Sequence, residues 1–247
     1  MALRDQQLRA LPATLFGLGA SVKSLDATGN RLSSLPEELI ALTAVQRIVL
    51  AQNALSSVPV SLCALTTLKL LVLDGNALTQ LPAELGQLKK LEKLSLADNK
   101  LAALPDSLGS LASLKSLTVS GNALTSLPDS LGGCACLEEV DASRNQLACL
   151  PASLGRLTRL RALQLDGNRI ATLPGEVLQG CTSLATLSLH DNPIDIGAME
   201  LVPGWADMQG RIQGKHAKRV AGGVLLGGRG LDDGLDHSLT RVVVPHT

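Results

Sequence analysis

The sequence predicts an α/β solenoid, a curved horseshoe with parallel strands on its concave face and short helical or 3-10 turns on its convex face. The first observation is that asparagine returns at residues 30, 53, 76, 99, 122, 145, 168 and 192, in steps of 23 residues until a last step of 24. The second is that leucines recur around every asparagine in the same order. The third is that aromatic residues make up only 1% of the 247-residue chain, so leucine must fill the core. Such self-similarity is typical of stacked repeats.

Each unit follows the pattern LxxLxLxxNxLxxLPxxLGxLxx, which is a leucine-rich repeat. Its LxLx segment alternates with period two, which predicts a short strand with Leu94 and Leu96 facing inward. The outward positions of that strand are then Lys93, Ser95 and Ala97. Because no single repeat can bury its own leucines, stacking must do so, and every strand then runs parallel to its neighbours.

Two further positions shape the turns of each repeat. The amide of Asn99 can bond the loop backbone, and its copies are expected to form a ladder inside the coil. In LPDSLGSL, Pro105 suits the first position of a helical turn and Gly109 is expected to end that turn. A period of 23 residues leaves room for short turns on the convex side rather than full helices.

The chain divides into four parts on this pattern. Residues 1–20 form an N-terminal capping half-repeat, with Gln6 in the place of asparagine and Phe16 in the leucine-rich turn. Eight leucine-rich repeats follow over residues 21–192, and residues 193–210 form a C-terminal cap in which Trp205 packs on the last repeat. An exposed Trp205 that anchors a partner is the alternative. Residues 211–247 are a Gly-rich tail that we expect to be flexible or to fold on contact.

The reactive side chains predict neither a metal site nor catalysis. Cys134 and Cys136 are spaced C-x-C without a second pair, and Cys134 and Cys181 replace inward leucines, so we expect buried, unpaired thiols and an intracellular setting. His190 beside Asp191 has no Ser or Cys nucleophile at a recognisable spacing, and we interpret it as a solvated turn residue. We therefore expect no catalytic residue, no metal and no cofactor.

The outward strand positions are the candidate binding surface, because they vary while the leucines repeat. Repeats two to four present an apolar patch with basic edges, and repeats six to eight present an acidic zone that also includes Asp191. The patch can equally reflect the preference of strands for β-branched residues and leucine. The predicted partner-binding residues are Arg47, Val49, Leu70, Val72, Lys93, Glu139, Asp141, Asp166 and His190.

Charge and hydropathy restrict the partners. The formal net charge is +0, which argues against binding to nucleic acid or to an anionic membrane through a general field. The apolar runs are far too short for an integral membrane segment, and MALRDQQLRALP has no signal-peptide pattern, so we expect a cytoplasmic protein. A protein of unspecified identity remains as the expected partner, and the sequence does not indicate the oligomeric state.

Two features of the tail could indicate a ligand, a group of glycines and a group of acidic residues with one histidine. Its glycines at 222, 223, 227 and 228 lack the Lys and Ser/Thr of a phosphate-binding loop. Asp232, Asp233, Asp236 and His237 could ligate a cation, but an acidic tail solvated by water is the preferred interpretation.

The repeat form LPxxLGxLxxLxxLxLxxNxL resembles that of plant intracellular Ras-group-related and Scribble/Shoc-type leucine-rich repeat proteins, and is closer still to leucine-rich repeat-containing protein 57-like proteins. The resemblance is carried by ALRDQQLRALP, LVLDGNALTQLPAELGQL, LGGCACLEEV, LSLHDNPI and VLLGGRGLDDGLD. It implies a horseshoe scaffold without known catalysis. Relatives often begin Met-Gly, a myristoylation start that Met1-Ala2 lacks, and carry a charged helix where the glycines of GWADMQGRIQGKHAKR argue against a stable helix.

Two functions follow from these expectations. The first is a non-catalytic scaffold that binds a protein through the concave face, in intracellular signalling by analogy with the family. The alternative is a structural subunit docked stably in a larger cytoskeletal or ciliary assembly.

Overall fold

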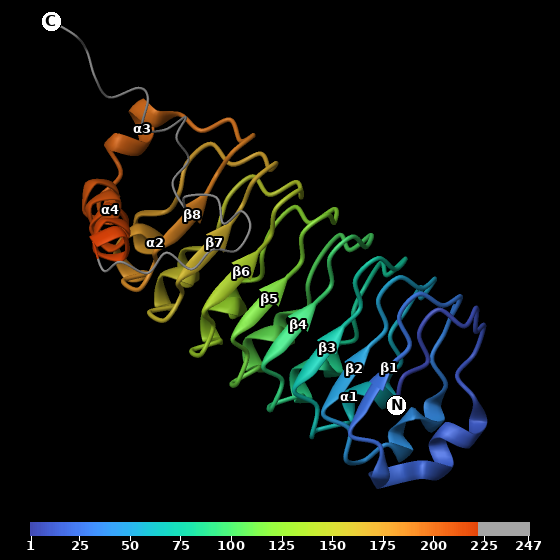
Figure 1. The fold of residues 1–247 in the computed structure, drawn as a ribbon. Helices are drawn as coiled ribbons and strands as arrows, with labels where there is room; N and C mark the ends of the chain where they lie inside the picture. The colour runs from blue at the N-terminus through green and yellow to red at the C-terminus, as the bar shows by residue number, and fades with distance from the viewer. Residues whose placement is uncertain (222–247) are drawn as a thin grey trace, which may run out of the picture.

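The computed structural model describes residues 1–221 and shows one curved solenoid with a single sheet (Figure 1). Eight three-residue strands lie in chain order, and each pairs in parallel with the next. They are β1 (Ser24–Asp26), β2 (Arg47–Val49), β3 (Leu70–Val72), β4 (Lys93–Ser95), β5 (Ser116–Thr118), β6 (Glu139–Asp141), β7 (Ala162–Gln164) and β8 (Thr186–Ser188). The predicted α/β leucine-rich repeat solenoid is confirmed.

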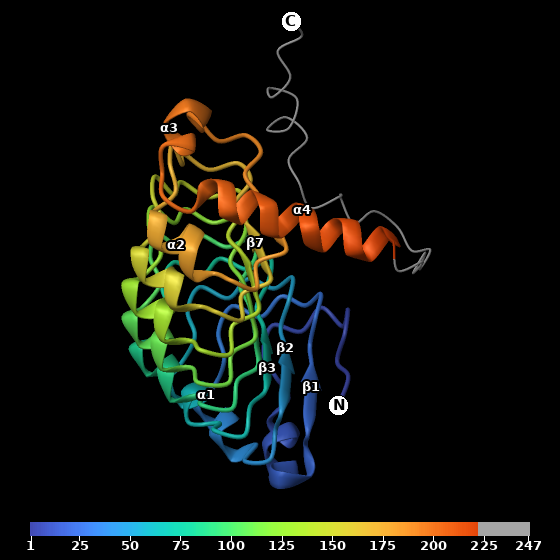
Figure 2. The same ribbon diagram turned by 90° about the vertical axis from the view of Figure 1, so that its left-hand side faces the viewer.

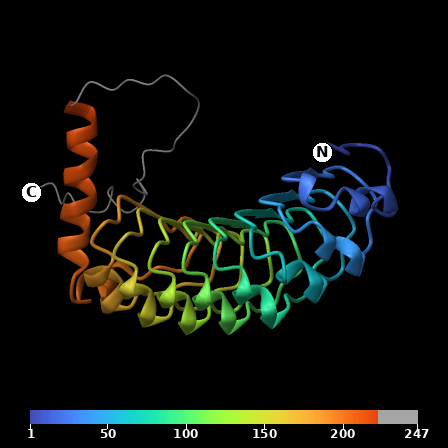
Figure 3. The ribbon, with the colours of Figure 1, turned by 90° about the horizontal axis from the view of Figure 1, so that it is seen from below.

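A short helical turn in each repeat lines the opposite, convex side of the coil, where Figure 3 shows the turns outside the bend and the sheet inside it. Most of these turns are 3-10 helices, as predicted from the short period. They are η1 (Ala13–Ser21), η2 (Glu37–Ala41), α1 (Val60–Cys63), η3 (Ala83–Gln87), η4 (Asp106–Ser110), η5 (Asp129–Gly133), η6 (Ala152–Arg156) and α2 (Gly175–Gly180). Two helices, α3 (Ile196–Glu200) and α4 (Trp205–Ala221), follow the last repeat.

The core is a continuous column of leucines between sheet and turns. Leu94 and Leu96 are fully buried, which confirms their inward direction. Ser95 departs from the prediction: we expected it to face outward, yet only 6% of it is exposed. It lies on the concave face between the larger side chains of its register partners Val72 and Thr118, which cover a side chain as short as serine.

The asparagines form the expected ladder, one rung in each of the eight repeats. The Asn99 Nδ2 donates to the carbonyl oxygen of Leu96 in its own repeat and to that of Leu73 in the preceding repeat, both at 3.0 Å. Its Oδ1 accepts the backbone N–H of Leu78 at 3.1 Å. Each rung therefore satisfies backbone groups of two repeats, which ties neighbouring coils together in the interior.

The glycine of the LG pair has a different role from the predicted one. Gly109 lies inside η4 rather than at its end, and its φ is not positive. A Cβ on Gly109 would lie 2.1 Å from the backbone oxygen of Ser130 in the next repeat. Gly86, Gly132 and Gly155 face the following repeat in the same way, at 2.2 to 2.4 Å. Glycine is therefore present because adjacent convex turns approach within backbone contact.

The residue before each ladder asparagine has a left-handed conformation, with φ from 52° to 71° across the eight repeats. This residue alternates along the chain between glycine (29, 75, 121, 167) and a longer side chain (Gln52, Asp98, Arg144, Asp191). The longer side chains lie over the glycines: Asp98 Oδ1 would be 2.3 Å from a Cβ on Gly121. Arg144 reaches across Gly121 to pair with Asp98 at 3.1 Å. The residue at this position therefore repeats every two units, although the fold repeats in every unit.

The N-terminal cap completes the first repeat by backbone pairing. The backbone N–H of Leu3 donates to the backbone carbonyl oxygen of Asp26 at 2.7 Å, and the guanidinium of Arg4 pairs with the Asp26 carboxylate. Partial burial would raise the pKa of Asp26, but hydrogen bonds from Arg4 and Thr28 outweigh it and leave this pKa below its ordinary value. Gln6 is exposed and contributes its backbone N–H, rather than its side chain, to Asn30.

The C-terminal cap is a helix that crosses the end of the solenoid (Figure 2). Trp205, Met208 and Ile212 of α4 are each less than 5% exposed, which confirms that Trp205 packs and excludes it as an exposed anchor. The expectation that glycines oppose a helix here is wrong, because burial of this apolar face outweighs a cost of about 1 kcal/mol for each glycine. The helix runs across the boundary that we placed between 210 and 211, and most of the Gly-rich tail lies outside the described residues.

Candidate protein-interaction face

The strand register places the candidate residues of repeats two to four in a compact group. Leu70 of β3 pairs with Arg47 of β2 on one side and with Lys93 of β4 on the other. Val72 pairs with Val49, one row further along the same strands. We call these five residues the concave patch. Its three aliphatic side chains are half-buried, and Arg47 and Lys93 are exposed on either side of Leu70.

The two cations of the concave patch differ from most neighbouring charges in having no ion pair within residues 1–221. A row of alternating charges runs just before the strands, where each side chain can pair with those of the adjacent repeats. Glu92 lies 2.7 Å from Lys115 and 3.8 Å from Lys69, and Arg161 lies 3.4 Å from Glu138. A hydrogen bond from Lys115 is the main reason why the pKa of Glu92 lies below its ordinary value. These exposed pairs contribute little stability.

The sequence reasoning overlooked this row of charges. The row could have been predicted, because basic and acidic residues alternate at steps of 23 residues: Lys69, Glu92, Lys115, Glu138 and Arg161. Charges in this row are therefore largely neutralised by ion pairs between repeats, whereas the cations of the concave patch are not.

The predicted acidic zone divides into two kinds of residue. Glu139 is exposed on β6, with Asp141 half-buried two residues later on the same face. Asp166, just after β7, instead bonds the end of the next strand: its Oδ1 accepts from the Ser188 hydroxyl at 2.6 Å and from the His190 N–H at 2.8 Å. His190 itself is half-buried beyond the end of β8. Glu139 and Asp141 are thus separated from Asp166 and His190, which lie at the carboxyl edge of the sheet.

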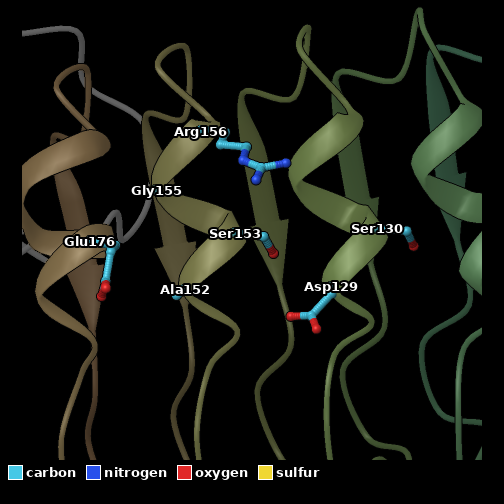
Figure 4. Close-up of a pocket in the computed structure, with 7 residues that line it drawn as sticks. All are labelled: Asp129, Ser130, Ala152, Ser153, Gly155, Arg156 and Glu176. Atoms are coloured by element: carbon cyan, nitrogen blue, oxygen red, sulfur yellow. The ribbon is translucent and has the colours of Figure 1, made fainter.

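The convex side has a shallow hollow between η5, η6 and α2, which Figure 4 shows with its lining side chains. The hydroxyls of Ser130 and Ser153 line it and have no hydrogen-bond partner in the described part of the chain. A second hollow lies between η3 and η4 and is lined by the corresponding positions of those repeats. The hollows follow from the spacing of convex turns and recur with it, so we do not assign them a ligand.

The cysteines are all free thiols. Cys134 and Cys181 are buried, as predicted from their leucine positions, and donate to the carbonyl oxygens of Leu108 and Leu154 at 3.2 and 3.3 Å. Burial raises the pKa of Cys63, Cys134 and Cys181 to about 11. Such thiols are inert at neutral pH.

Neither a metal-binding cluster nor a membrane-spanning helix occurs among the described residues. Of the side chains whose placement the structure describes, no three His, Cys, Asp or Glu gather closely enough to hold a metal ion. None of the helices up to Ala221 has the length and apolarity needed to span a lipid bilayer.

Known proteins resemble this chain mainly in its repeats. The family described as Leucine rich repeat matches residues 20–78 and 89–147. The Plant intracellular Ras-group-related LRR protein 8 of Oryza sativa subsp. japonica is 37% identical over 50 residues, which cover 20% of this chain and 13% of that protein. Protein 7 of the same series is 39% identical over 51 residues, covering 21% of this chain and 20% of that protein. The matches therefore span a small part of these relatives.

Solved structures align over much more of the chain. The LRR protein LIC12759 of Leptospira interrogans has a TM-score of 0.73 at 30% identity, covering 86% of this chain and 58% of that one. An internalin of Listeria monocytogenes has a TM-score of 0.63 at 23% identity, covering 73% of this chain and 52% of that one. The ectodomain of the Arabidopsis thaliana receptor kinase GASSHO1/SCHENGEN3 has a TM-score of 0.66 at 33% identity, covering 74% of this chain and 23% of that one. With its eight stacked repeats and the family match, the chain is a leucine-rich repeat protein.

Proposed function

We propose that this protein is a non-catalytic scaffold that binds a protein partner through the concave face of its solenoid. The observation that carries this proposal is the concave patch, whose aliphatic side chains remain half-exposed although the inward leucines already form a complete core. Apolar side chains on an open face lose solvent contact only when a partner covers them. The patch thus supplies surface that is available for association.

The composition of the concave patch favours a contact of moderate strength. Tyr and Trp, which dominate tight interfaces, are absent from it, and Arg47 is its single arginine. Two exposed cations beside aliphatic side chains favour a partner with acidic and aliphatic groups. The structural relative GASSHO1/SCHENGEN3 is described in complex with CASPARIAN STRIP INTEGRITY FACTOR 2, which supports partner binding on this fold. The word intracellular in the names of the rice relatives supports a cytoplasmic location.

Affinity capture with patch variants tests the proposal. The triple variant Val49→Glu, Leu70→Glu, Val72→Glu places three carboxylates on the concave face, and we expect it to lose partners that the wild type captures. A matched control carries Leu18→Glu and Ile40→Glu on the convex turns, where these side chains are 47% and 49% exposed. Both variants are first checked for an unchanged far-UV circular dichroism spectrum. Equal partner sets for the wild type and the patch variant would refute the assignment of the concave face.

A further inference from the structure

We propose that the chain carries its own ligand for the concave patch: residues 231–236, LDDGLD, bind there in cis and cover the patch until a partner displaces them. This inference rests on the proposed function, because it concerns the same surface. Three properties support it: the spacing of the charges, the reach of the chain and the lack of other counter-charges.

The spacing of two carboxylates in the segment matches that of the two cations. Arg47 and Lys93 flank Leu70 in register, so their Cα atoms are two strand spacings, about 9.5 Å, apart. Asp233 and Asp236 are three residues apart. In a polyproline II conformation, residues three apart project from the same side at about 9.3 Å. A segment that crosses the strands in this conformation would place one carboxylate near each cation.

The segment also has an aliphatic side chain that could contact those of the concave patch. With its two carboxylates over Arg47 and Lys93, the backbone of the segment would pass over Leu70. Leu235 would then project sideways, within reach of the row formed by Val49 and Val72. Burial of these groups contributes roughly 25 cal/mol for each Å² of apolar surface removed from water.

The chain is long enough to reach the patch. Figure 3 shows that α4 rises past the sheet, so that its Ala221 end lies on the concave side of the solenoid. From β8 to β3 the sheet spans five strand spacings, about 24 Å, and a 17-residue helix is about 25 Å long. Taken at right angles, these two lengths give a path of about 35 Å from the end of α4 to the patch. Asp233 is twelve residues beyond Ala221, and twelve residue steps can extend over about 40 Å.

The cations of the patch have no competing partner in the described part of the chain. The basic residues Lys69, Lys115 and Arg161 of the neighbouring row pair with glutamates, whereas Arg47 and Lys93 do not. Glu139, the exposed acidic residue of this face, is two strands away from Lys93. A carboxylate from outside the sheet is thus the complement that the patch lacks.

Zero-length carbodiimide cross-linking of the full-length protein tests this inference, because it joins a carboxylate to a lysine amine only where the two are in contact. We expect cross-links from Asp233 or Asp236 to Lys93, identified by mass spectrometry. Lys100 is the internal reference, since it is exposed on the same repeat but outside the patch. Arg47→Gln should lower the Lys93 yield about two- to fivefold, the effect of one exposed ion pair. Arg156→Gln on the convex face is the matched control and should leave the yield unchanged.

Mixing equal amounts of unlabelled and ¹⁵N-labelled chains separates binding within one chain from binding between chains. Cross-links that join only like-labelled peptides support the cis assignment, and mixed pairs overturn it in favour of a second copy. Equal yields at Lys93 and Lys100, or a yield that Arg47→Gln leaves unchanged, also overturn the inference. If the Lys93 cross-link is absent while the patch variant still loses partners in affinity capture, the proposed function stands and the cis ligand does not.

Discussion

Replacing Asn99 by alanine tests the central feature of the fold, the asparagine ladder. The Asn99 amide is 8% exposed, accepts from the Leu78 N–H and donates to the Leu73 and Leu96 carbonyl oxygens, with distances of 3.0 to 3.1 Å. Alanine leaves the Leu78 N–H unpaired in the interior, whereas each of the two carbonyl oxygens keeps the hydrogen bond that it accepts from a second ladder asparagine. An orphaned buried group costs about 1–3 kcal/mol, so loss of the Leu78 partner should lower the free energy of unfolding by about 1–3 kcal/mol.

Urea denaturation followed by circular dichroism measures this change. The slope m is compared between variants, because a solenoid whose cooperativity breaks down would show a lower m and no single free energy. Lys100→Ala is the matched control: its side chain is exposed on the next residue, and such changes are usually within about 0.5 kcal/mol. A loss below about 1 kcal/mol for Asn99→Ala, at unchanged m, would refute the assignment of the ladder as a main link between repeats.

Three further predictions follow from the packing and the ionisable groups. Gly109→Ala should destabilise the protein by about 1–3 kcal/mol in urea denaturation, since the added methyl overlaps the Ser130 backbone, and equal stability would contradict that contact. At pH 8, only the accessible thiols of Cys136 and Cys149 should react rapidly with a disulfide reagent, and all five after unfolding; more than two rapid thiols in the native protein would contradict the burial. Because the pKa of Asp26 is lowered by folding from its ordinary 3.8, its contribution to stability is present at neutral pH and lost as the pH falls below about 4. The stability difference between wild type and Asp26→Asn should therefore shrink between pH 7 and pH 3, and a constant difference would show that the pairing is not responsible.

Much of the candidate site followed from the repeat alignment. Once the strands were placed, the alternation of side chains put Arg47, Val49, Leu70 and Val72 on one face, and the register confirms that they are neighbours. What the alignment could not show is which outward residues stay accessible. Ser95 is covered by its neighbours. Asp166 bonds the following loop, because its carboxylate lies within reach of a backbone N–H one repeat away.

By itself, the sequence determined the number of repeats, the parallel order of the strands, the leucine core and the asparagine ladder. These features depend on a period and on the direction of each side chain, both of which can be read along the chain. Only the tertiary structure decided why Gly109 is a glycine, why the residue before the asparagine alternates over two repeats, and that α4 forms despite its glycines. Each of these depends on the distance between one coil and the next or on surface buried at the end of the stack, and a one-dimensional pattern contains neither quantity.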